Sequence, residues 1–486
     1  MSDLGLGSWP ARRARIAPHA TALREADRQL SYAELADRVD RLAAGLARLG
    51  VRAGDRVAHL GPNAIATFEA LFAAGRLGAI FVPLNTRLAP PEIAVQLADC
   101  TPTVLIHAPD VTPPPGAAIT LSVEAFAALA DEPTDPAGLA DGHVDLAQAA
   151  VILYTSGTTG RPKGVVLTHA NLTFNVVNQL AHVDVLSTDV VLCTAPLFHA
   201  AGLGQVSLPT LFKGGTVVVA PRFDPGWLLA TVAAQRIQAF SAVPTMLQML
   251  CEHPDWATAD LSSLRYVIYG GSPVVEWVAR AWHERGVPIL QGYGMTEAAP
   301  GALLATVAGA ADKPTSPGVP HFFTDVRTDP DGQLLVRGPH VSPGYWQRQQ
   351  ETAEAFRDGW FLSGDVARPD ADGWFTVLGR VRDMFISGGE NVYPAEVEAA
   401  LAELPGVAAC AVLGVADARW GEVGLALVVP HPGAGLDEAA VQVHLSSRIA
   451  RYKVPRYVRF VDDLPRTATG KVRKSDLPAF TPEENT

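Results

Sequence analysis

Residues 154–165 read Tyr-Thr-Ser-Gly-Thr-Thr-Gly-Arg-Pro-Lys-Gly-Val and follow an apolar run, 149–153, that is typical of a buried strand. Gly157 and Gly160 let successive backbone N–H groups turn toward one anion. Hydroxyl side chains and one lysine add further donors and a positive charge. These donors are Thr155, Ser156, Thr158, Thr159 and Lys163. A strand that runs into such a loop is suited to hold phosphate.

The loop differs from the common phosphate motifs. A P-loop has four residues between its glycines and then Gly-Lys-Ser/Thr. Here two residues separate Gly157 from Gly160, and Gly164 follows Lys163. A run rich in Ser, Thr and Gly can also be a plain surface turn, so the rest of the chain has to decide between the two interpretations.

Length and composition indicate a globular protein of more than one domain. The chain has 486 residues, which is more than one hydrophobic core usually organises. Hydrophobic residues make up 48% and charged residues 18%, a globular composition. The net charge of −12 argues against a general nucleic-acid binder, because a phosphate backbone requires a basic face. A local basic pocket for an anionic cofactor remains compatible with it.

The chain carries no sign of secretion or of a membrane span. Its 4 cysteines lie far apart, without metal-binding spacing, as expected for reduced thiols. The N-terminus lacks a basic segment followed by an apolar core. Residues 190–212 have no Asp, Glu, Lys or Arg, but prolines, glycines and polar residues interrupt them, which favours a core strand, loop and helix. We expect a cytoplasmic protein.

Helix and strand patterns alternate in the first part of the chain. Ser31-Tyr32-Ala33-Glu34 is a capping box, and the leucines and valine that follow mark one face of a helix. A strand at 56–60, a helix at 64–77 and a strand at 78–82 come next, which predicts an α/β fold. From about residue 318, short strands alternate with turns, which indicates a small barrel. Beyond 379–383 the pattern predicts helix, strand, strand and helix, and the tail from 383 onward is long enough for a separate domain.

Two glycine-containing stretches follow predicted strands. Residues 269–273 read Tyr-Gly-Gly-Ser-Pro, which allows a flat ligand to approach the backbone but also fits a tight turn. Residues 291–297 read Gln-Gly-Tyr-Gly-Met-Thr-Glu. There Tyr293 can stack on a base, Thr296 can donate to a phosphate oxygen and Glu297 can ligate Mg²⁺. A Thr-Glu pair alone would indicate only a helix cap.

Three single residues have a structural and a functional interpretation. His199 stands in the apolar stretch 196–203, where a lone histidine is more often a packed core residue. Asp365 lies between a strand and a turn, and can be a turn residue or an acceptor for two hydroxyl groups. Lys471 lies near the C-terminus, where a lysine is usually a solvated charge.

These stretches, in this order, resemble the core motifs of the adenylate-forming superfamily. The superfamily includes acyl-CoA synthetases, adenylation domains of nonribosomal peptide synthetases and firefly luciferase. Besides the loop at 154–165, the most specific match is 379–398, which reads GRVRDMFISGGENVYPAEVE and resembles the family's hinge motif. The stretches 291–297 and 465–471 match two further motifs. The resemblance covers nearly the whole chain, from the capping box to Lys471.

The resemblance implies an α/β fold in two parts. Residues 1–380 would form a large N-terminal domain of two α/β subdomains and a small β-barrel-like subdomain. Residues 381–383 would be the hinge, and 384–486 a small, mobile α+β domain. Family members carry Asp or Lys at the hinge position, where this chain has Arg382. Arginine is also flexible and charged, so domain rotation is expected to survive.

The resemblance also assigns roles to individual residues. The catalytic group would be Lys471, Thr296, Glu297 and His199, with Glu297 as the metal ligand. ATP and AMP would contact Thr155, Ser156, Gly157, Thr158, Thr159, Gly160, Lys163, Gly270, Gly271, Ser272, Tyr293, Gly294, Asp365 and Arg380. The acyl pocket would be Phe198, His199, Ala200, Ala201, Gly202, Tyr269, Gly271 and Gly292. CoA would meet Ser387, Gly388, Gly389, Glu390 and Lys453, although the basic stretch 451–455 fits a solvated face equally well.

The implied reaction joins a carboxylic acid to CoA. With ATP and Mg²⁺ the acid would form an acyl-adenylate and release pyrophosphate, and the CoA thiol would then displace AMP. Alternatives are an enzyme that loads a carrier-protein thiol, one that performs only one half-reaction, an oxygenase like luciferase, and a non-catalytic nucleotide sensor. Segments 198–203, 243–246 and 269–274 contain no Arg or Lys, which favours an apolar acyl or aryl acid over a dicarboxylate such as malonate.

Overall fold

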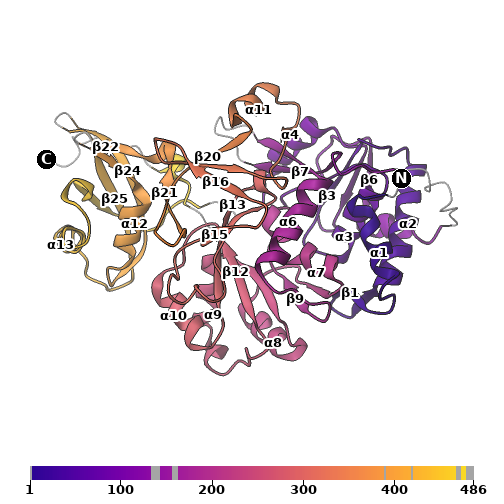
Figure 1. The fold of residues 1–486 in the computed structure, drawn as a ribbon, viewed down its shortest axis with the longest axis horizontal. Coiled ribbons are helices and arrows are strands. Elements are labelled where there is room, and N and C mark those ends of the chain that lie inside the picture. The colour runs from indigo at the N-terminus through magenta and orange to yellow at the C-terminus, as the bar shows by residue number, and fades with distance from the viewer. Residues whose placement is uncertain are drawn as a thin grey trace.

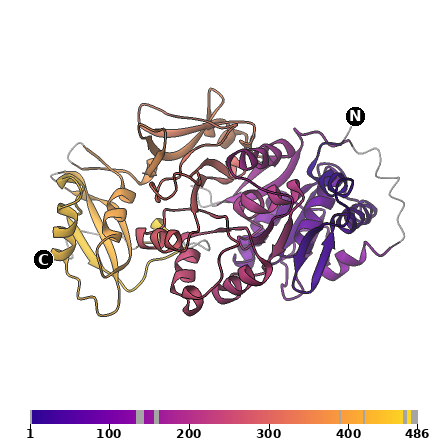
Figure 2. The ribbon, with the colours of Figure 1, turned by 60° about the horizontal axis from the view of Figure 1, so that its bottom comes forward.

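The structure, a computed structural model, describes residues 3–132, 143–155, 162–387, 390–417, 420–466 and 472–477. Its described strands form four sheets, and the N-terminal and C-terminal parts of the chain lie at opposite ends of an elongated molecule (Figures 1 and 2). The fold is the mixed α/β class that the sequence predicts, with a large N-terminal part and a small C-terminal part.

A seven-stranded sheet carries the phosphate loop. Its order is β18-β8-β7-β4-β3-β5-β6, parallel from β7 to β6 and antiparallel where β8 and β18 join. The strands are β3 (Arg56–Leu60), β4 (Ile80–Pro83), β5 (Val104–His107), β6 (Ile119–Ser122), β7 (Ala149–Thr155), β8 (Lys163–Thr168) and β18 (Gly344–Tyr345). The predicted strands at 56–60 and 149–153 are confirmed.

A nine-stranded sheet carries the other half of the site. Its order is β15-β14-β13-β12-β11-β9-β10-β1-β2, and its central strands are parallel. The strands are β1 (Thr21–Glu25), β2 (Arg28–Ser31), β9 (Val190–Cys193), β10 (Thr216–Val219), β11 (Ala239–Ala242), β12 (Tyr266–Gly270), β13 (Ile289–Gly294), β14 (Gly301–Leu304) and β15 (Val319–Pro320).

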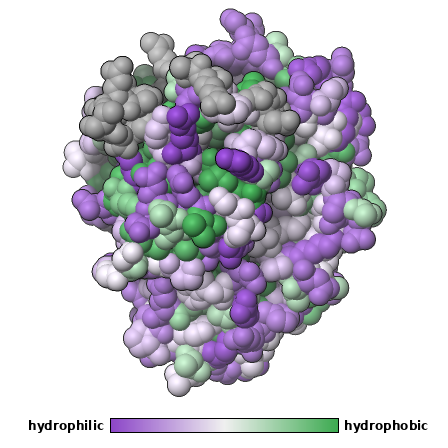
Figure 3. All heavy atoms as spheres, turned by 90° about the vertical axis from the view of Figure 1, so that its left-hand side faces the viewer, coloured by the Kyte–Doolittle hydropathy of each residue, from purple (hydrophilic) through white to green (hydrophobic). Residues whose placement is uncertain are grey.

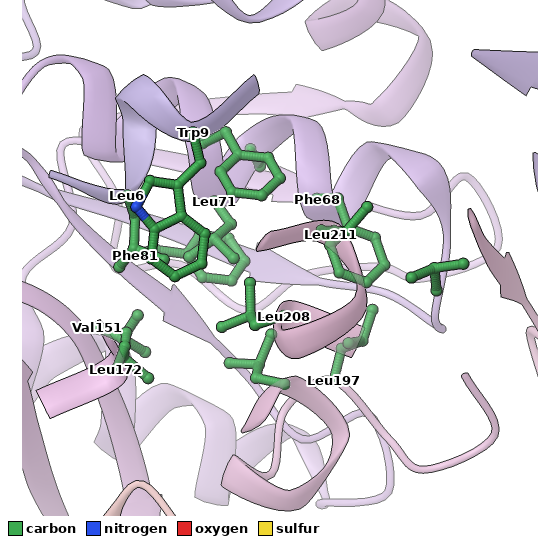
Figure 4. Packing of buried hydrophobic residues seen from close by; sticks show 14 of the residues in the cluster. Leu6, Trp9, Phe68, Leu71, Phe81, Val151, Leu172, Leu197, Leu208 and Leu211 are labelled. Carbon is green, nitrogen blue, oxygen red and sulfur yellow. The ribbon is translucent and has the colours of Figure 1, made fainter. Parts of the chain in front are cut away.

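Helices pack between the two sheets and on their outer faces. The inner helices are α1 (Trp9–Ala14), α2 (Tyr32–Arg48), α3 (Ile65–Arg76), α6 (His169–His182) and α7 (Leu208–Lys213), whose side chains join both sheets in one buried cluster (Figure 4). The outer helices are α8 (Pro225–Gln235), α9 (Pro244–Glu252) and α10 (Glu276–Glu284) on the nine-stranded sheet, and α4 (Pro90–Cys100) on the seven-stranded sheet. Helix α5 (Val123–Ala128) follows β6.

Local sequence signals place these helices. Ser31 Oγ accepts from the Glu34 backbone N–H at 3.2 Å, and Glu34 accepts from the Ser31 N–H at 2.7 Å, which is the predicted capping box at the start of α2. The run at 190–212 divides into β9, a loop, a π-helical segment at Gly202–Ser207 and α7, as predicted. No helix of the described residues is long and apolar enough to cross a membrane.

A third, antiparallel sheet stands where the sequence predicts a small barrel. Its strands are β16 (Asp325–Thr328), β17 (Gln333–Arg337), β19 (Phe356–Arg357), β20 (Trp360–Pro369) and β21 (Phe375–Arg380). Both β19 and β21 pair with β20, and the short helix α11 (Gln349–Ala355) precedes them. This sheet ends at Arg380, directly before the predicted hinge.

The C-terminal unit has its own sheet and core. After a 3₁₀ turn at Val381–Asp383 come β22 (Phe385–Ser387), β23 (Glu390–Val392), α12 (Pro394–Ala402), β24 (Val407–Asp417), β25 (Gly421–Pro430), α13 (Glu438–Ser446) and β26 (Tyr457–Phe460). The predicted order of helix, strand, strand and helix is confirmed by α12, β24, β25 and α13. Its hydrophobic side chains cluster separately from those of the large part.

Candidate active site

The described ends of the phosphate loop are held together by a hairpin. In the antiparallel pair β7–β8, Thr155 lies opposite Lys163, and Tyr154 lies opposite Gly164. Residues 156–161 are outside the described residues, so the predicted donors Ser156, Gly157, Thr158, Thr159 and Gly160 are not placed. The pairing nevertheless puts the hydroxyl of Thr155 and the ammonium of Lys163 at the two ends of this loop.

Glu297 reaches the site through a tight return of the backbone. After β13, a 3₁₀ turn spans Thr296–Ala298, and the Met295 N–H donates to Pro300 O at 2.9 Å. A Cβ on Gly294 would lie 1.8 Å from Pro300 O, so only glycine allows this return. Thr296 and Glu297 are thereby presented together just beyond the end of the strand.

The carboxylate of Glu297 is held by one side chain among the described residues. Tyr345 donates its O–H to Glu297 Oε1 at 2.9 Å, and the backbone N–H of Glu297 itself also bonds to the carboxylate. Burial raises the pKa of Glu297 above its ordinary value, and its own backbone N–H, the hydrogen bond from Tyr345 and the charges of Arg380 and Lys163 oppose that shift.

This donor set fits a magnesium ion that also binds a nucleotide. No cluster of three or more His, Cys, Asp or Glu residues within the described ranges can hold a metal ion by itself. Mg²⁺ typically takes one or two carboxylates and completes its shell with water and substrate phosphates. The single carboxylate of Glu297, which lies near Lys163, matches that pattern.

Asp365 forms the second charged point of the site. Its Oδ2 accepts from the Tyr293 O–H at 2.6 Å, and its Oδ1 pairs with Arg380 Nε at 2.8 Å. Asp365 and Arg380 are register partners in β20 and β21, whereas Tyr293 comes from β13. Burial, and then the charge of Asp365, raise the pKa of Tyr293 well above its ordinary value, so Tyr293 remains a donor. The contact joins the nine-stranded sheet to the third sheet.

The predicted acyl segment is shaped by close backbone packing. A Cβ on Gly202 would lie 2.2 Å from Pro196 O, and one on Gly204 would lie 2.6 Å from Ala299 O. Phe198 and Ala200 are buried, and the rings of Phe198 and His199 meet edge to face with centroids 4.8 Å apart. The segment that follows is π-helical, a form often found at functional sites.

The strand ends β12 and β13 complete this region. A Cβ on Gly270 would lie 3.1 Å from Gly292 O and 3.6 Å from Gln205 Nε2, so these backbones and the Gln205 amide lie close together. Gly271 and Ser272 are exposed, and Gly271 has a φ of 100°. Tyr269 is fully buried, with its O–H 3.0 Å from Gln291 Oε1 and 3.1 Å from Pro314 O.

The C-terminal residues of the prediction are only partly placed. Ser387 is buried and lies opposite Glu390 in the β22–β23 pair. Gly388, Gly389 and Lys471 are outside the described residues, as are the side chains of Glu390 and Arg382. Lys453 Nζ pairs with Glu396 at 2.6 Å, on α12 of the same unit. The predicted CoA contacts therefore stay predictions.

The C-terminal unit also exposes apolar side chains. Its surface in Figure 3 shows hydrophobic residues gathered among polar ones. Strands β22 and β25 meet at Ser387 and Gly421. The residues just before these two, Ile386 and Trp420, are 48% and 45% exposed.

Sequence reasoning missed one residue that the structure brings into the site. Tyr345 bonds to Glu297, and Lys163 Nζ lies 5.2 Å from the centroid of its ring. The available signal was Gly344-Tyr345-Trp346, an aromatic pair after a glycine, which has no specific chemistry by itself. Its role depends on β18 pairing with β8, a contact between segments about 180 residues apart that no local pattern predicts.

Comparison with known proteins places the whole chain in one group. Residues 10–346 match the family described as AMP-binding enzyme, and 396–471 match the AMP-binding enzyme C-terminal domain. A feruloyl-CoA synthase from Amycolatopsis sp is 52% identical over 98% of this chain and 99% of the relative. An indoleacetate–CoA ligase from Aromatoleum aromaticum is 43% identical over 97% of both chains.

Solved structures agree along the full length. The o-succinylbenzoate CoA synthetase MenE from Bacillus subtilis, in complex with its acyl-adenylate intermediate, is 31% identical with a TM-score of 0.87, and 98% of each chain is covered. ATP-bound MatB from Rhodopseudomonas palustris is 32% identical with a TM-score of 0.88 and the same coverage.

Proposed function

We propose that this chain, which belongs to the AMP-binding enzyme family, is an AMP-forming acid–CoA ligase that acts on aromatic carboxylic acids. One observation carries the proposal. Strand β13 and the turn after it carry residues of two charged groups. Tyr293 bonds to Asp365 at one of them. Glu297 bonds at the other to Tyr345, whose ring also contacts Lys163. A nucleotide with its ribose at one point and its phosphates at the other would be held along this edge.

The nucleotide would be bound by groups of three kinds. Asp365 would accept the ribose hydroxyls, supported by Arg380. Thr155, Lys163 and the rest of the loop would hold the β- and γ-phosphates. The carboxylate of Glu297 would hold Mg²⁺, which neutralises phosphate charge when it is bound. The ring of Tyr293 and the backbone at 270–272 would lie against the adenine.

In the first half-reaction the acid's carboxylate attacks the α-phosphorus of ATP. The new bond is acyl O–P, the bond to the β-phosphate oxygen breaks, and pyrophosphate leaves with that electron pair. An anion attacking a polyanion requires cations and fixed donors where charge gathers. Thr296 would donate to the α-phosphate, Lys471 would lie between it and the carboxylate, and His199 would donate a hydrogen bond beside them.

In the second half-reaction the thiolate of CoA attacks the acyl carbon. The C–S bond forms, the C–O bond to AMP breaks, and AMP leaves with the electron pair. We propose that rotation at 381–383 withdraws Lys471 and brings the loop 387–390 to the site, where it would wall the path of the pantetheine arm. The Cys thiols lie buried or half-buried, and burial raises the pKa of each one, so they are poor nucleophiles and no covalent enzyme intermediate is included.

The choice of an aromatic acid has two supports. The relatives at 52% and 43% identity are named for feruloyl and indoleacetate groups, both of them aromatic. The segments 198–203, 243–246 and 269–274 have no Arg or Lys that could pair with a second carboxylate.

A panel of acids tests this proposal. The enzyme is incubated with ATP, Mg²⁺ and one acid from ferulate, indoleacetate, o-succinylbenzoate, malonate and a long-chain fatty acid, with and without CoA. Mass spectrometry then measures adenylates and thioesters. We expect thioesters of ferulate or indoleacetate to exceed those of malonate by at least about a hundredfold. Equal turnover of malonate, or adenylates that acylate a carrier protein but never CoA, would contradict it.

A further inference from the structure

Tyr345 contacts two groups of the site that come from different sheets. Its O–H donates to Glu297 Oε1 at 2.9 Å, and Glu297 follows the last residues of β13 in the nine-stranded sheet. Its ring faces Lys163 Nζ, 5.2 Å from the centroid, and Lys163 opens β8 of the seven-stranded sheet. One side chain therefore links the carboxylate and the ammonium that the proposed function assigns to the phosphates of ATP.

The backbone around Tyr345 is firmly held. Its N–H donates to Thr352 Oγ1 at 3.0 Å. A Cβ on Gly344, which has a φ of 141°, would lie 2.3 Å from the Thr352 side chain, so the chain at 344 passes too close for any other residue. Ser342 donates its N–H to Glu297 O at 2.7 Å. The segment that carries the ring is thus attached both to α11 and to the turn that carries Glu297.

A fixed donor on one carboxylate oxygen sets the direction of the other. Glu297 has three rotatable side-chain bonds, and Tyr345 is the side chain that, among the described residues, donates a hydrogen bond to its carboxylate. With Oε1 bonded to a fixed hydroxyl, rotation of the carboxylate is restricted and Oε2 is the oxygen available to a metal ion. Groups that orient a metal ligand in this way often affect metal affinity strongly when they are removed.

We propose that Tyr345 is a positioning residue for nucleotide binding. Its hydroxyl orients the Glu297 carboxylate toward the magnesium ion of ATP, and its ring supports Lys163. This inference rests on the proposed function, because it takes Glu297 as the metal ligand. It adds a residue from β18, the edge strand of the seven-stranded sheet, to the site.

Calorimetry with an unreactive nucleotide tests the proposal without turnover. Wild type and Tyr345→Phe are titrated with α,β-methylene-ATP, with and without Mg²⁺. The substitution keeps the ring near Lys163 and removes only the hydroxyl. We expect the affinity gained on adding Mg²⁺ to fall roughly tenfold in Tyr345→Phe, while the affinity without Mg²⁺ stays within about twofold. Tyr345→Leu removes the ring as well, so it should weaken binding under both conditions.

Two controls separate positioning from stability. Tyr32→Phe removes another buried tyrosine hydroxyl, which lies 2.7 Å from Gly215 O in a distant part of the core, and should leave the gain from Mg²⁺ unchanged. Thr352→Val removes the acceptor for the Tyr345 N–H and should lower the gain in the same direction but by less. It keeps the test decisive if Tyr345→Phe folds poorly.

The outcomes are distinct. An undiminished gain from Mg²⁺ in Tyr345→Phe, or an equal loss with and without Mg²⁺, would overturn the inference. In turnover, the expected signature is a higher KM for Mg·ATP in adenylation, with thioester formation from preformed acyl-adenylate unchanged. Failure of wild type to form an adenylate from any acid would instead refute the proposed function, since the titration requires no acid.

Discussion

At the nucleotide end of the candidate site, tyrosine hydroxyls hold the carboxylates. Tyr293 bonds to Asp365 and Tyr345 bonds to Glu297, so each charged group has a fixed neutral donor. At the acyl end, the shape comes from side chains that are missing. Glycines at 202 and 204 let backbone segments approach within distances that a Cβ would prevent.

The two ends also differ in what lies beneath them. The nucleotide end depends on contacts between sheets. The acyl end is supported by helix α6, where Asn175 donates to Gly204 O at 2.9 Å and accepts from the Gly301 N–H at 3.3 Å. Buried histidines stand near both ends of that helix. The nucleotide end therefore recognises its ligand by charge, and the acyl end recognises its ligand by shape. Substitutions at one end should change the KM for that end's substrate and leave the other KM unchanged.

The largest effect is expected from Glu297→Gln. The amide keeps an acceptor for Tyr345 but loses the charge that a metal ion needs. Adenylation, measured by acid-dependent pyrophosphate release, should fall about 100- to 1000-fold. Thioester formation from preformed acyl-adenylate should be nearly unchanged, since pyrophosphate has already left. A fall in adenylation of less than threefold would remove Glu297 from the nucleotide end.

Lowering the pH should reduce the stability of the packing around helix α6, which supports the acyl end. Burial lowers the pKa of His169 to about 4, and burial together with His182 and His340 lowers that of His321 well below its ordinary value. In the unfolded chain these groups protonate near 6.5, so the unfolded state binds more protons and stability falls as pH drops below that value. At pH 5 the shift of His169 should cost about 2 kcal/mol in the free energy of unfolding, and that of His321 acts in the same direction.

Denaturant unfolding at pH 7 and pH 5 measures that loss. The loss should level off below pH 4 for His169, and His169→Gln should show a smaller drop than wild type. Equal unfolding free energies for wild type at the two pH values would mean that these histidines do not constrain the fold.

A smaller effect is expected from Asp365→Asn. The substitution keeps the shape but weakens the acceptor for ribose hydroxyls and removes the partner of Arg380. The KM for ATP should rise about tenfold, with kcat within about threefold, because the interaction is made before and during the reaction alike. Steady-state pyrophosphate release at varied ATP measures both. An unchanged KM would show that the ribose does not bind at Asp365.

The smallest effect is expected from Gly270→Ala. The added methyl would lie 3.1 Å from Gly292 O and 3.6 Å from Gln205 Nε2, so the pocket must yield slightly. Because the backbone at 270–272 is proposed to lie against the adenine, the KM for ATP should rise about fivefold and that for an aromatic acid should stay constant. A change in the KM for the acid alone would place Gly270 at the acyl end instead.

Sequence reasoning succeeded where residue type carries chemistry. The capping box of α2, the strand before the phosphate loop and the order of elements after residue 383 follow from local patterns. Glu297 and Asp365 were named as candidates because their motifs resemble those of the adenylate-forming superfamily, and the structure places Asp365 inside β20 rather than between a strand and a turn. The tyrosine hydroxyls were not foreseen, because a hydroxyl's partner depends on how distant strands pair. The acyl end was harder to predict. The hydroxyl of Tyr269 lies near Gln291 and Pro314 in the core, and glycines in a sequence do not indicate which acid binds beside them.

The central claim is that one site first joins the acid to AMP and then passes it to CoA. Rapid chemical quench of enzyme mixed with ATP, Mg²⁺ and ferulate, with CoA added afterwards, tests it most directly. We predict that feruloyl-adenylate and pyrophosphate appear first, and that CoA then converts the adenylate to feruloyl-CoA with an equal amount of AMP. Acid-dependent formation of ADP and phosphate, or of a thioester without a preceding adenylate, would contradict the claim.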